Sequence, residues 1–256
     1  MQQVMNDSRP VVILLHSLGT SGKMWNGVAG FLSDRFIILN PNSRGHNDER
    51  NEISLENWVD DILAVITSQT EKSVHLVGIS MGGVQALAFA QTHPDRVKSV
   101  TLANTFAALD SETAQRKIDQ MDQDIHDLGM ARFASRYLET TLTTKIPSQD
   151  YKSLYGSIAN VSPEAYMASA RATFGADLTS GLEGMAVPTL IVTADRDNKT
   201  PGELSQFLNE RIRGSRLLSI AQAGHLSSVE QPAQFASALS SFFESREAIP
   251  RSSMTV

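Results

Sequence analysis

The sequence predicts an α/β fold, a mostly parallel and doubly wound sheet that carries an all-helical insertion. From residue 11 onward, short runs of aliphatic residues alternate with amphipathic stretches of helical period. Most of these runs are continuously apolar, which is typical of parallel strands covered by helices on both faces. One long interval, residues 107–186, contains no such run. We therefore expect one sheet whose strands are separated, at one point along the chain, by a helical insertion.

The strands and helices follow one another in a regular order. Pro201 and Pro232 stand where helices are expected to begin, since the first turn of a helix needs no amide hydrogen there. The predicted strands are 11–16, 36–39, 74–77, 97–103, 189–193 and 216–220, and the predicted helices between them are 23–33, 54–68, 82–92, 202–211 and 232–245.

The interval from 107 to 186 has the pattern of helices alone. Ile118, Met121, Ile125 and Leu128 recur at helical spacing, and Ser162-Pro163 suits a helix start. Because the interval follows the end of a strand, we expect it over the carboxyl edge of the sheet, where open α/β sheets bind ligands. The sequence thus predicts a core of residues 1–106 and 187–256 and a helical cap of residues 107–186.

Length, charge and cysteine content exclude several classes of protein. A chain of 256 residues with 41% apolar residues suits one domain, and no run reaches the ~18 apolar residues of a membrane span. The first ten residues lack the features of a signal peptide. The absence of cysteine excludes disulfides and thiolate chemistry, and a net charge of −6 argues against nucleic-acid binding. We expect a cytoplasmic protein with a small-molecule partner and no metal or organic cofactor, of undetermined oligomeric state.

The stretch GISMGG, residues 78–83, places a serine between glycines where an apolar strand gives way to a helix. Glycines let the backbone turn sharply, so that Ser80 projects from the edge of the sheet. The helix that follows directs amide hydrogens and the positive end of its dipole toward the same place. We expect Ser80 to be a nucleophile; the alternative is a glycine-rich turn with a structural serine.

A serine hydroxyl needs a base, and the base needs a carboxylate to orient it. His225, in AQAGHLSSVE, follows the last apolar strand and is expected at the same edge of the sheet as Ser80; the alternative is an ordinary surface-loop histidine. The stretch TADRDNKTP offers Asp195 and Asp197 after the strand at 189–193. We favour Asp197 because of its place relative to Pro201, and the other aspartate is then a turn or capping residue.

An acyl-transfer site also needs amide donors for the developing oxyanion. Met81, directly after the serine, supplies one, and Leu18 in the loop HSLGT is expected to supply the other. His16 closes the first strand and is expected to order this loop by hydrogen bonding, and His46 could do the same. The alternative is that residues 16–20 form a simple turn between strand and helix.

Several stretches together resemble a known family. HSLGTSGKMW, SRGH, GISMGG, the ANT after the strand at 97–103, and AGHLSSVEQP are similar to α/β hydrolases, and within them to the enol-lactone hydrolases of the β-ketoadipate pathway. The order Ser80, Asp197, His225 is that of the superfamily. The similarity runs from Val11 to about Phe243. A usual D-x-R-G-H-G motif is replaced here by NSRGHN.

The resemblance implies a serine hydrolase that cleaves a small lactone or short-chain ester. A general carboxylesterase, a carbon–carbon hydrolase of ring-cleavage products and a non-catalytic small-ligand receptor are the alternatives. The substrate of the related enzymes carries a carboxylate, so a cation is expected in the cap. Arg132, Arg136 and Arg171 are the candidates, and for any single one of them the sequence favours a solvated helix face over a binding role. Phe106 is expected to line the floor of the pocket.

Overall fold

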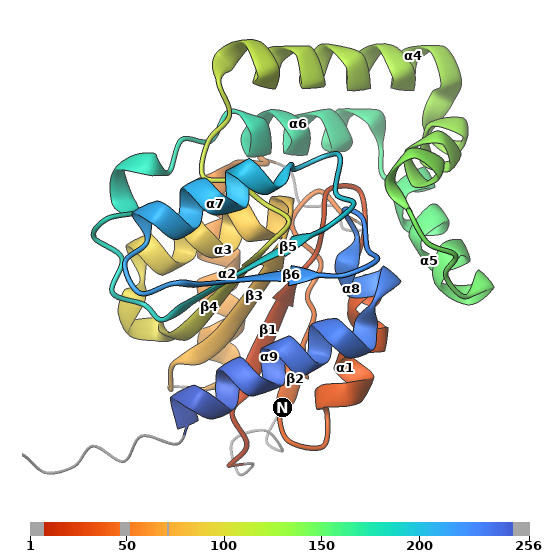
Figure 1. Cartoon of the computed structure of the whole chain (residues 1–256). Coiled ribbons are helices and arrows are strands. Elements are labelled where there is room, and N and C mark those ends of the chain that lie inside the picture. The colour runs from red at the N-terminus through yellow and green to blue at the C-terminus, as the bar shows by residue number, and fades with distance from the viewer. Residues whose placement is uncertain (1–7, 47–51, 71, 248–256) are drawn as a thin grey trace, which may run out of the picture.

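The computed structural model describes residues 8–46, 52–70 and 72–247 of the chain. Six strands form one parallel sheet in the order β2-β1-β3-β4-β5-β6 (Figure 1). Residues 1–7, part of the segment judged to lack a signal peptide, lie outside the described range. The strands are β1 (Val11–Leu15), β2 (Ile37–Leu39), β3 (Val74–Ile79), β4 (Val97–Ala103), β5 (Thr189–Ala194) and β6 (Arg216–Ile220).

The direction of winding reverses beside β1. Val12 of β1 lies opposite Ile38 of β2 on one side and His75 of β3 on the other. The chain therefore leaves β1 toward one edge of the sheet and returns across it to build the other half. In doubly wound sheets, ligands bind at the carboxyl ends of the strands at this reversal, which here means the ends of β1 and β3.

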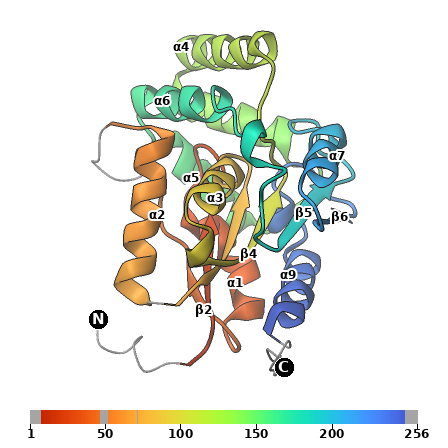
Figure 2. The ribbon, with the colours of Figure 1, turned by 90° about the vertical axis from the view of Figure 1, so that its left-hand side faces the viewer.

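Helices cover both faces of the sheet, as the continuously apolar strands predict. Helices α1 (Asn26–Leu32) and α9 (Pro232–Glu247) lie on one face, and α2 (Leu55–Gln69), α3 (Met81–Thr92) and α7 (Gly202–Arg211) lie on the other (Figures 1 and 2). Among the described residues, no helix has both the length and the apolar character needed to cross a bilayer.

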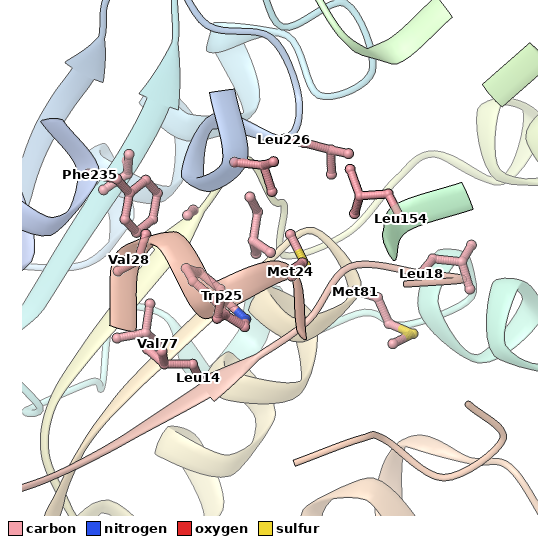
Figure 3. Close-up of a cluster of buried hydrophobic side chains, with 14 of the residues drawn as sticks. Leu14, Leu18, Met24, Trp25, Val28, Val77, Met81, Leu154, Leu226 and Phe235 are labelled. Atoms are coloured by element: carbon pink, nitrogen blue, oxygen red, sulfur yellow. The ribbon is translucent and has the colours of Figure 1, made fainter. Parts of the chain in front are cut away.

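The residues of β1 alternate between two buried clusters. Val12 and Leu14 pack with Trp25 and Phe235 on the side of α1 and α9 (Figure 3). Ile13 points the other way, into the cluster formed with α2 and α3. Trp25 is fully buried, and its ring meets that of Phe235 edge to face at 5.6 Å between centroids. Both faces of the strand are thus removed from water, which fixes its register.

Three helices fill the interval between β4 and β5. They are α4 (Ser111–Thr141), α5 (Ser148–Ala159) and α6 (Pro163–Phe174), and Figure 1 shows them beyond the carboxyl ends of the strands. Gly129 has φ 68° and ψ 160°, which breaks α4 into two arms. Ser162 caps α6 by accepting a hydrogen bond from the Ala165 amide, as the Ser-Pro start predicts. The division of the chain into core and cap stays a prediction.

The predicted strands and helices match the observed ones to within about two residues at their ends. The stretch at 23–33 differs in that it opens with a 3₁₀ turn, Gly22–Trp25, before α1. Helix α8 (Ser227–Glu230) and the 3₁₀ turns Pro94–Arg96 and Thr179–Gly181 were not predicted. Such single turns are too short to produce a hydrophobic period in the sequence.

Candidate active site

Ser80 lies at a sharp turn between β3 and α3. Its backbone has φ 54° and ψ −118°, a conformation that non-glycine residues rarely adopt. The turn is held from both sides, because the Ser80 amide donates to the Ala103 carbonyl at 2.9 Å and the Thr105 hydroxyl donates to the Ser80 carbonyl at 2.8 Å. The strained conformation is therefore enforced by β4 and the residues after it.

The glycines of the motif are required by close backbone approaches. A Cβ atom on Gly78 would lie 1.9 Å from the Gly82 carbonyl oxygen, and one on Gly82 would lie 2.3 Å from the Leu15 carbonyl oxygen. No side chain tolerates such contacts with backbone. The motif thus brings α3 directly against β1 and β3, which presents the Ser80 side chain at the sheet edge.

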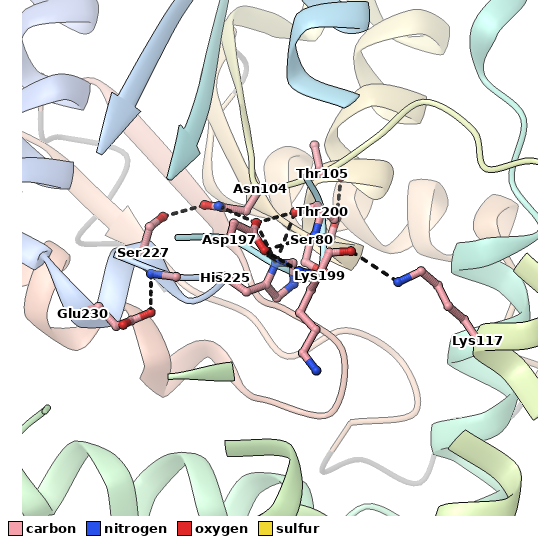
Figure 4. Close-up of polar contacts among 11 residues, drawn as sticks. Ser80, Asn104, Thr105, Lys117, Asp197, Lys199, Thr200, His225, Ser227 and Glu230 are labelled. Atoms are coloured by element: carbon pink, nitrogen blue, oxygen red, sulfur yellow. Dashed lines mark hydrogen bonds and ion pairs between the residues drawn. The ribbon is translucent and has the colours of Figure 1, made fainter. Parts of the chain in front are cut away.

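Ser80, His225 and Asp197 form one chain of hydrogen bonds (Figure 4). The Ser80 hydroxyl lies 2.9 Å from Nε2 of His225, and Nδ1 of His225 lies 3.0 Å from Oδ2 of Asp197. Because Nδ1 faces a carboxylate, it carries the ring proton, and Nε2 is free to accept the hydroxyl proton. Such an arrangement can convert a serine hydroxyl into a nucleophile.

Asp197 is almost completely buried, and its carboxylate accepts several hydrogen bonds from protein groups. It accepts hydrogen bonds from the amides of Lys199 and Thr200 at 2.8 and 3.0 Å, and from the Asn104 side-chain amide at 2.8 Å. Burial opposes ionisation. The attraction of the His225 ring in its protonated form and the hydrogen bonds from His225 and Thr200 outweigh it and hold the pKa of Asp197 well below its usual range. The carboxylate stays ionised.

Asp195 has a different environment. It is exposed, and its carboxylate accepts a hydrogen bond from the Ala223 amide at 3.2 Å. It thereby joins the loop after β5 to the turn that precedes His225. Of the two aspartates that the sequence offered, the structure brings Asp197 to the histidine and gives Asp195 a turn-stabilising contact.

Hydrogen bonds occupy the amides on both sides of Leu18 in the loop after β1. The Gly19 amide donates to Nε2 of His46 at 2.9 Å, and the Thr20 amide donates to the Ser17 carbonyl at 3.1 Å. Within the described parts of the chain, the Leu18 amide between them makes no such bond. Met81 is the first residue of α3, where the amide has no acceptor inside the helix. Both positions adjoin Ser80, as an oxyanion-binding pair requires.

Two buried histidines support this loop. His16 donates from Nδ1 to the Ser17 carbonyl and accepts at Nε2 from the Ser43 amide, both at 2.9 Å. Burial lowers the pKa of His16 to about 4. Burial, together with repulsion from the His16 ring in its protonated form, lowers the pKa of His46 to about 3. Both rings are therefore neutral, and each accepts an amide hydrogen at Nε2. The expectation that His16 and His46 order this region by hydrogen bonding is confirmed.

An inner cavity opens beside Ser80, and a second, outer cavity adjoins it. The inner cavity has a volume of about 50 Å³ and is lined by Ser80, His225, Leu18, Phe106, Thr173 and Phe174 together with side chains of the second cavity. The outer cavity has a volume of about 360 Å³. Lys117, Met121, Tyr137 and Lys199 line both, so the two spaces are neighbours. Burial raises the pKa of Tyr137 to about 12, so the tyrosine in this shared wall carries a neutral phenol.

A family model described as the alpha/beta hydrolase fold matches residues 10–232. The chain belongs to this family. The sheet order, the strained serine turn and the chain order of serine, aspartate and histidine agree with membership.

Relatives of this hydrolase include named enzymes. It is 27% identical to 3-oxoadipate enol-lactonase 1 of Acinetobacter baylyi over 93% of this chain and 90% of the relative. It is 26% identical to a pimeloyl-[acyl-carrier protein] methyl ester esterase of Neisseria meningitidis over 94% and 95% of the two chains. The relatives are named as hydrolases, and the chain is an enzyme of the hydrolase class.

Solved structures agree on the fold. An enol-lactonase from Burkholderia xenovorans superposes with a TM-score of 0.84 at 24% identity, covering 93% of this chain and 92% of the other. An esterase from Exiguobacterium antarcticum superposes with a TM-score of 0.85 at 22% identity, covering 93% and 92%. The resemblance to α/β hydrolases and to enol-lactonases, and the predicted fold class, are confirmed.

The residues expected to bind substrate in the hydrolase differ in whether they line the cavities beside Ser80. Phe106 lines the inner cavity beside Ser80. Arg136 lines the outer cavity and pairs with Asp124 at 3.2 Å, while Arg132 and Arg171 are exposed and line neither cavity. A substrate-binding role for the three arginines stays a prediction. Lys117 and Lys199, which the sequence did not single out, line the inner cavity together with Ser80.

Two partners of Asp197 were also missed. Thr200 donates its hydroxyl to Oδ2 of Asp197 and lies 3.2 Å from Nδ1 of His225, and Asn104 joins Asp197 to the Ser227 hydroxyl. Asn104 belongs to the ANT stretch and Thr200 to the loop that holds the aspartate. Their proximity in sequence to strand ends was the available signal.

Glu230 joins the helical insertion to the histidine loop. Its Oε2 accepts from the amides and hydroxyls of Thr143 and Thr144 at 2.8 to 3.1 Å, and its Oε1 accepts from the Gly224 amide at 2.9 Å. Gly224 precedes His225 directly. No sequence pattern links residues 87 positions apart, so this contact had to come from the structure. Among the described residues, no cluster of three acidic, histidine or cysteine side chains is arranged to hold a metal.

Proposed function

We propose that this chain hydrolyses a carboxylic ester or lactone, with Ser80 as the nucleophile, His225 as the general base and Asp197 as the residue that orients it. The observation that carries the proposal is the continuous hydrogen-bonded chain from Ser80 through His225 to Asp197, which opens on a cavity. The names of the enol-lactonase and esterase relatives support this class of substrate.

The reaction then runs in two steps. Ser80 Oγ attacks the carbonyl carbon while Nε2 of His225 takes its proton, and the amides of Leu18 and Met81 bind the oxygen that becomes negative. In known enzymes each such donor contributes about 3 kcal/mol to the transition state. His225 returns the proton to the leaving oxygen, and an acyl-enzyme remains. Water, deprotonated by His225, attacks the acyl group and releases the acid and Ser80.

The size of the inner cavity supports a compact group at the scissile bond. About 50 Å³ bounded by Phe106 and Phe174 suits the carbonyl and its nearest atoms rather than a long acyl chain. The helices of residues 107–186 close this space from above, and we propose that they act as its cap (Figure 1). A small lactone or a short-chain ester fits these dimensions best, and little activity is expected on long-chain lipids.

The test is to compare wild type with Ser80→Ala on nitrophenyl esters and lactones. Turnover should fall to the background rate while the melting temperature stays near that of wild type. Ser68→Ala, an exposed serine on α2, is the control and should keep its activity. A fluorophosphonate should label wild type once per chain at Ser80. Retention of most of kcat in Ser80→Ala would refute the nucleophile.

Two further measurements on wild type separate the alternatives. Hydrolysis of vinylogous diketones in preference to esters would indicate a carbon–carbon hydrolase. Stoichiometric binding of a lactone with negligible turnover by wild type would indicate a receptor that retains the arrangement of a hydrolase.

A further inference from the structure

Two lysines stand at the boundary between the inner and outer cavities. Lys117 comes from α4 and Lys199 from the loop between β5 and α7, and both line each cavity. The Lys117 ammonium donates to the Lys199 carbonyl at 3.3 Å (Figure 4). The Lys199 ammonium donates to the Thr140 hydroxyl at 3.2 Å. Both acceptors are neutral, and each ammonium has two further hydrogens to donate.

The setting of these lysines is unfavourable for positive charge. Burial, the neighbouring charge of Lys199 and that of Arg116 lower the pKa of Lys117, and burial lowers the pKa of Lys199. Within the described chain neither ammonium is paired with a carboxylate at ion-pair distance. Asp197 acts on both from a distance, but its oxygens are already occupied by the groups described above.

Aromatic rings partly stabilise the charged form of both lysines. The Lys117 ammonium lies 5.9 Å from the centroid of Phe174, and the Lys199 ammonium lies 5.9 Å from that of Tyr137. Such contacts hold the two charges in place at the cavity wall. These ring contacts do not replace an anionic partner, and among the described residues neither ammonium has one.

The outer cavity is positively charged as a whole. Arg116, Lys117, Arg136 and Lys199 line it against one carboxylate, Asp124, which is already paired with Arg136 at 3.2 Å. Its volume of about 360 Å³ is several times that of the inner cavity. The space nearest to Ser80 is therefore compact and largely apolar, and the space beyond the lysines is larger and cationic.

We infer that Lys117 and Lys199 bind a terminal anionic group of the substrate, whose scissile ester or lactone bond lies in the inner cavity and whose charged end points toward the outer one. The inference rests on the proposed hydrolase function and names its substrate class. Carboxylate and phosphate share the required chemistry, since each offers several acceptor oxygens to two ammonium groups. Lysines rather than the predicted cap arginines then select the substrate.

The experiment uses nitrophenyl esters of one chain length that end in a carboxylate, a phosphate or a neutral carboxamide. Wild type should prefer one anionic ester to the carboxamide by about tenfold or more in kcat/KM, the effect of a hydrogen bond to a charged group. Lys117→Met and Lys199→Met should each reduce this preference about tenfold, chiefly through KM for the anionic ester. The anionic ester with the larger preference identifies carboxylate or phosphate.

Lys145→Met is the matched control. Lys145 is exposed and lines neither cavity. The substitution Lys145→Met removes the same charge as the two cavity variants and should leave the preference for the anionic ester at its wild-type value. Equal losses on charged and neutral esters in the two cavity variants, carried by kcat, would mean that the lysines stabilise the transition state and would overturn the inference.

A binding experiment separates the inference from the proposed function. An alkane dicarboxylate or a carboxyalkyl phosphate, titrated into wild type by calorimetry, should bind about tenfold more tightly than into Lys117→Met or Lys199→Met. This measurement needs no turnover, so it decides the anion site even if no ester is hydrolysed. Neutral esters hydrolysed without any preference for an anionic end would leave the hydrolase proposal intact and refute the anion site. Melting temperatures check that each variant is folded.

Discussion

Asp195 and Asp197 stand two positions apart in one loop but have opposite environments. Asp197 is buried and holds His225 at 3.0 Å, whereas Asp195 is exposed and holds a turn amide at 3.2 Å. We predict that Asp197→Asn lowers kcat by about 10⁴-fold, because an amide at this position favours the wrong histidine tautomer, as known for a serine protease. Asp195→Asn should lower it by less than about tenfold, since it weakens a surface turn.

Steady-state kinetics on one nitrophenyl ester, with circular dichroism as a check of folding, test this pair. A larger loss in Asp195→Asn than in Asp197→Asn would contradict the assignment. The two substitutions remove the same charge from the same loop, so each serves as the control for the other.

This pair also defines what the sequence could predict about the site. The chain order of serine, aspartate and histidine at strand ends was enough to propose Ser80, Asp197 and His225. Which groups stabilise the aspartate was not predictable, because Asn104 lies 93 positions away from it and meets it through the pairing of β4 with β5. Long-range neighbours of a site depend on three-dimensional packing, which local patterns do not contain.

At the scale of elements, the contact of α3 with β1 depends on a missing side chain. A methyl group on Gly82 would lie 2.3 Å from the Leu15 carbonyl oxygen, whereas one on Gly156, inside α5, meets no atom within 4 Å. We predict that Gly82→Ala destabilises the protein by several kcal/mol or prevents folding, since backbone must move. Gly156→Ala should stabilise it by about 0.5–1 kcal/mol, because alanine loses less entropy in a helix.

Urea denaturation gives both free energies of unfolding, and Gly156→Ala is the matched control for the added methyl group. If Gly82→Ala were as stable as wild type, the close packing of the motif against β1 would be wrong.

The connection through Glu230 is a second prediction at this scale. Its buried carboxylate ties Thr143 and Thr144, which follow α4, to Gly224, next to His225. In Glu230→Gln an NH₂ group replaces one carboxylate oxygen and faces amide or hydroxyl donors that it cannot accept from. The negative charge that strengthens the remaining hydrogen bonds is also lost. We predict a loss of about 2–3 kcal/mol in stability, the scale of a hydrogen bond to a charged group, together with a lower kcat.

Glu210→Gln, an exposed residue of α7, is the control for the charge change and should alter neither quantity. An unchanged free energy of unfolding in Glu230→Gln would mean that the contact contributes nothing to the attachment of the helical insertion.

The elements differed in how well the sequence predicted them. β4 and β6 match their predicted bounds, and β1, which lies inside the sheet, was recognisable because apolar residues face helices on both sides. The break in α4 at Gly129 was not predicted, because the apolar period from Ile118 to Leu128 ends just before it. Where a helix changes direction depends on what it covers, and that information lies outside its own residues.

At the scale of the whole molecule, two neutral histidines are buried together under the sheet edge. The rings of His16 and His46 lie 5.0 Å apart between centroids, and both are inaccessible to solvent. Their pKa values are about 4 and about 3 in the folded protein and 6.5 in a solvated chain. Between these values the unfolded chain binds more protons than the folded one, so stability falls as the pH falls below 6.5.

We predict that this proton uptake governs the first phase of acid destabilisation. From pH 7 to pH 5 each histidine should cost about 2 kcal/mol, about 4 kcal/mol together, because each pH unit inside the window is worth about 1.4 kcal/mol. The contribution of Asp197 is lost at lower pH, as its folded pKa lies below the usual range. His46→Gln keeps an acceptor for the Gly19 amide without a titrating ring, so it should lose about half of this pH dependence.

Urea unfolding of wild type and His46→Gln at pH 7 and pH 5 measures the effect as a difference of differences. His126→Gln replaces an exposed histidine of α4 and should keep the full wild-type pH dependence. An equal drop in stability in all three proteins would mean that the buried pair takes up no extra protons on unfolding. The loop that carries Leu18 rests on these rings, and both rings stay neutral in the folded protein at pH 5. We therefore expect the loop to keep its hydrogen bonds until the protein unfolds.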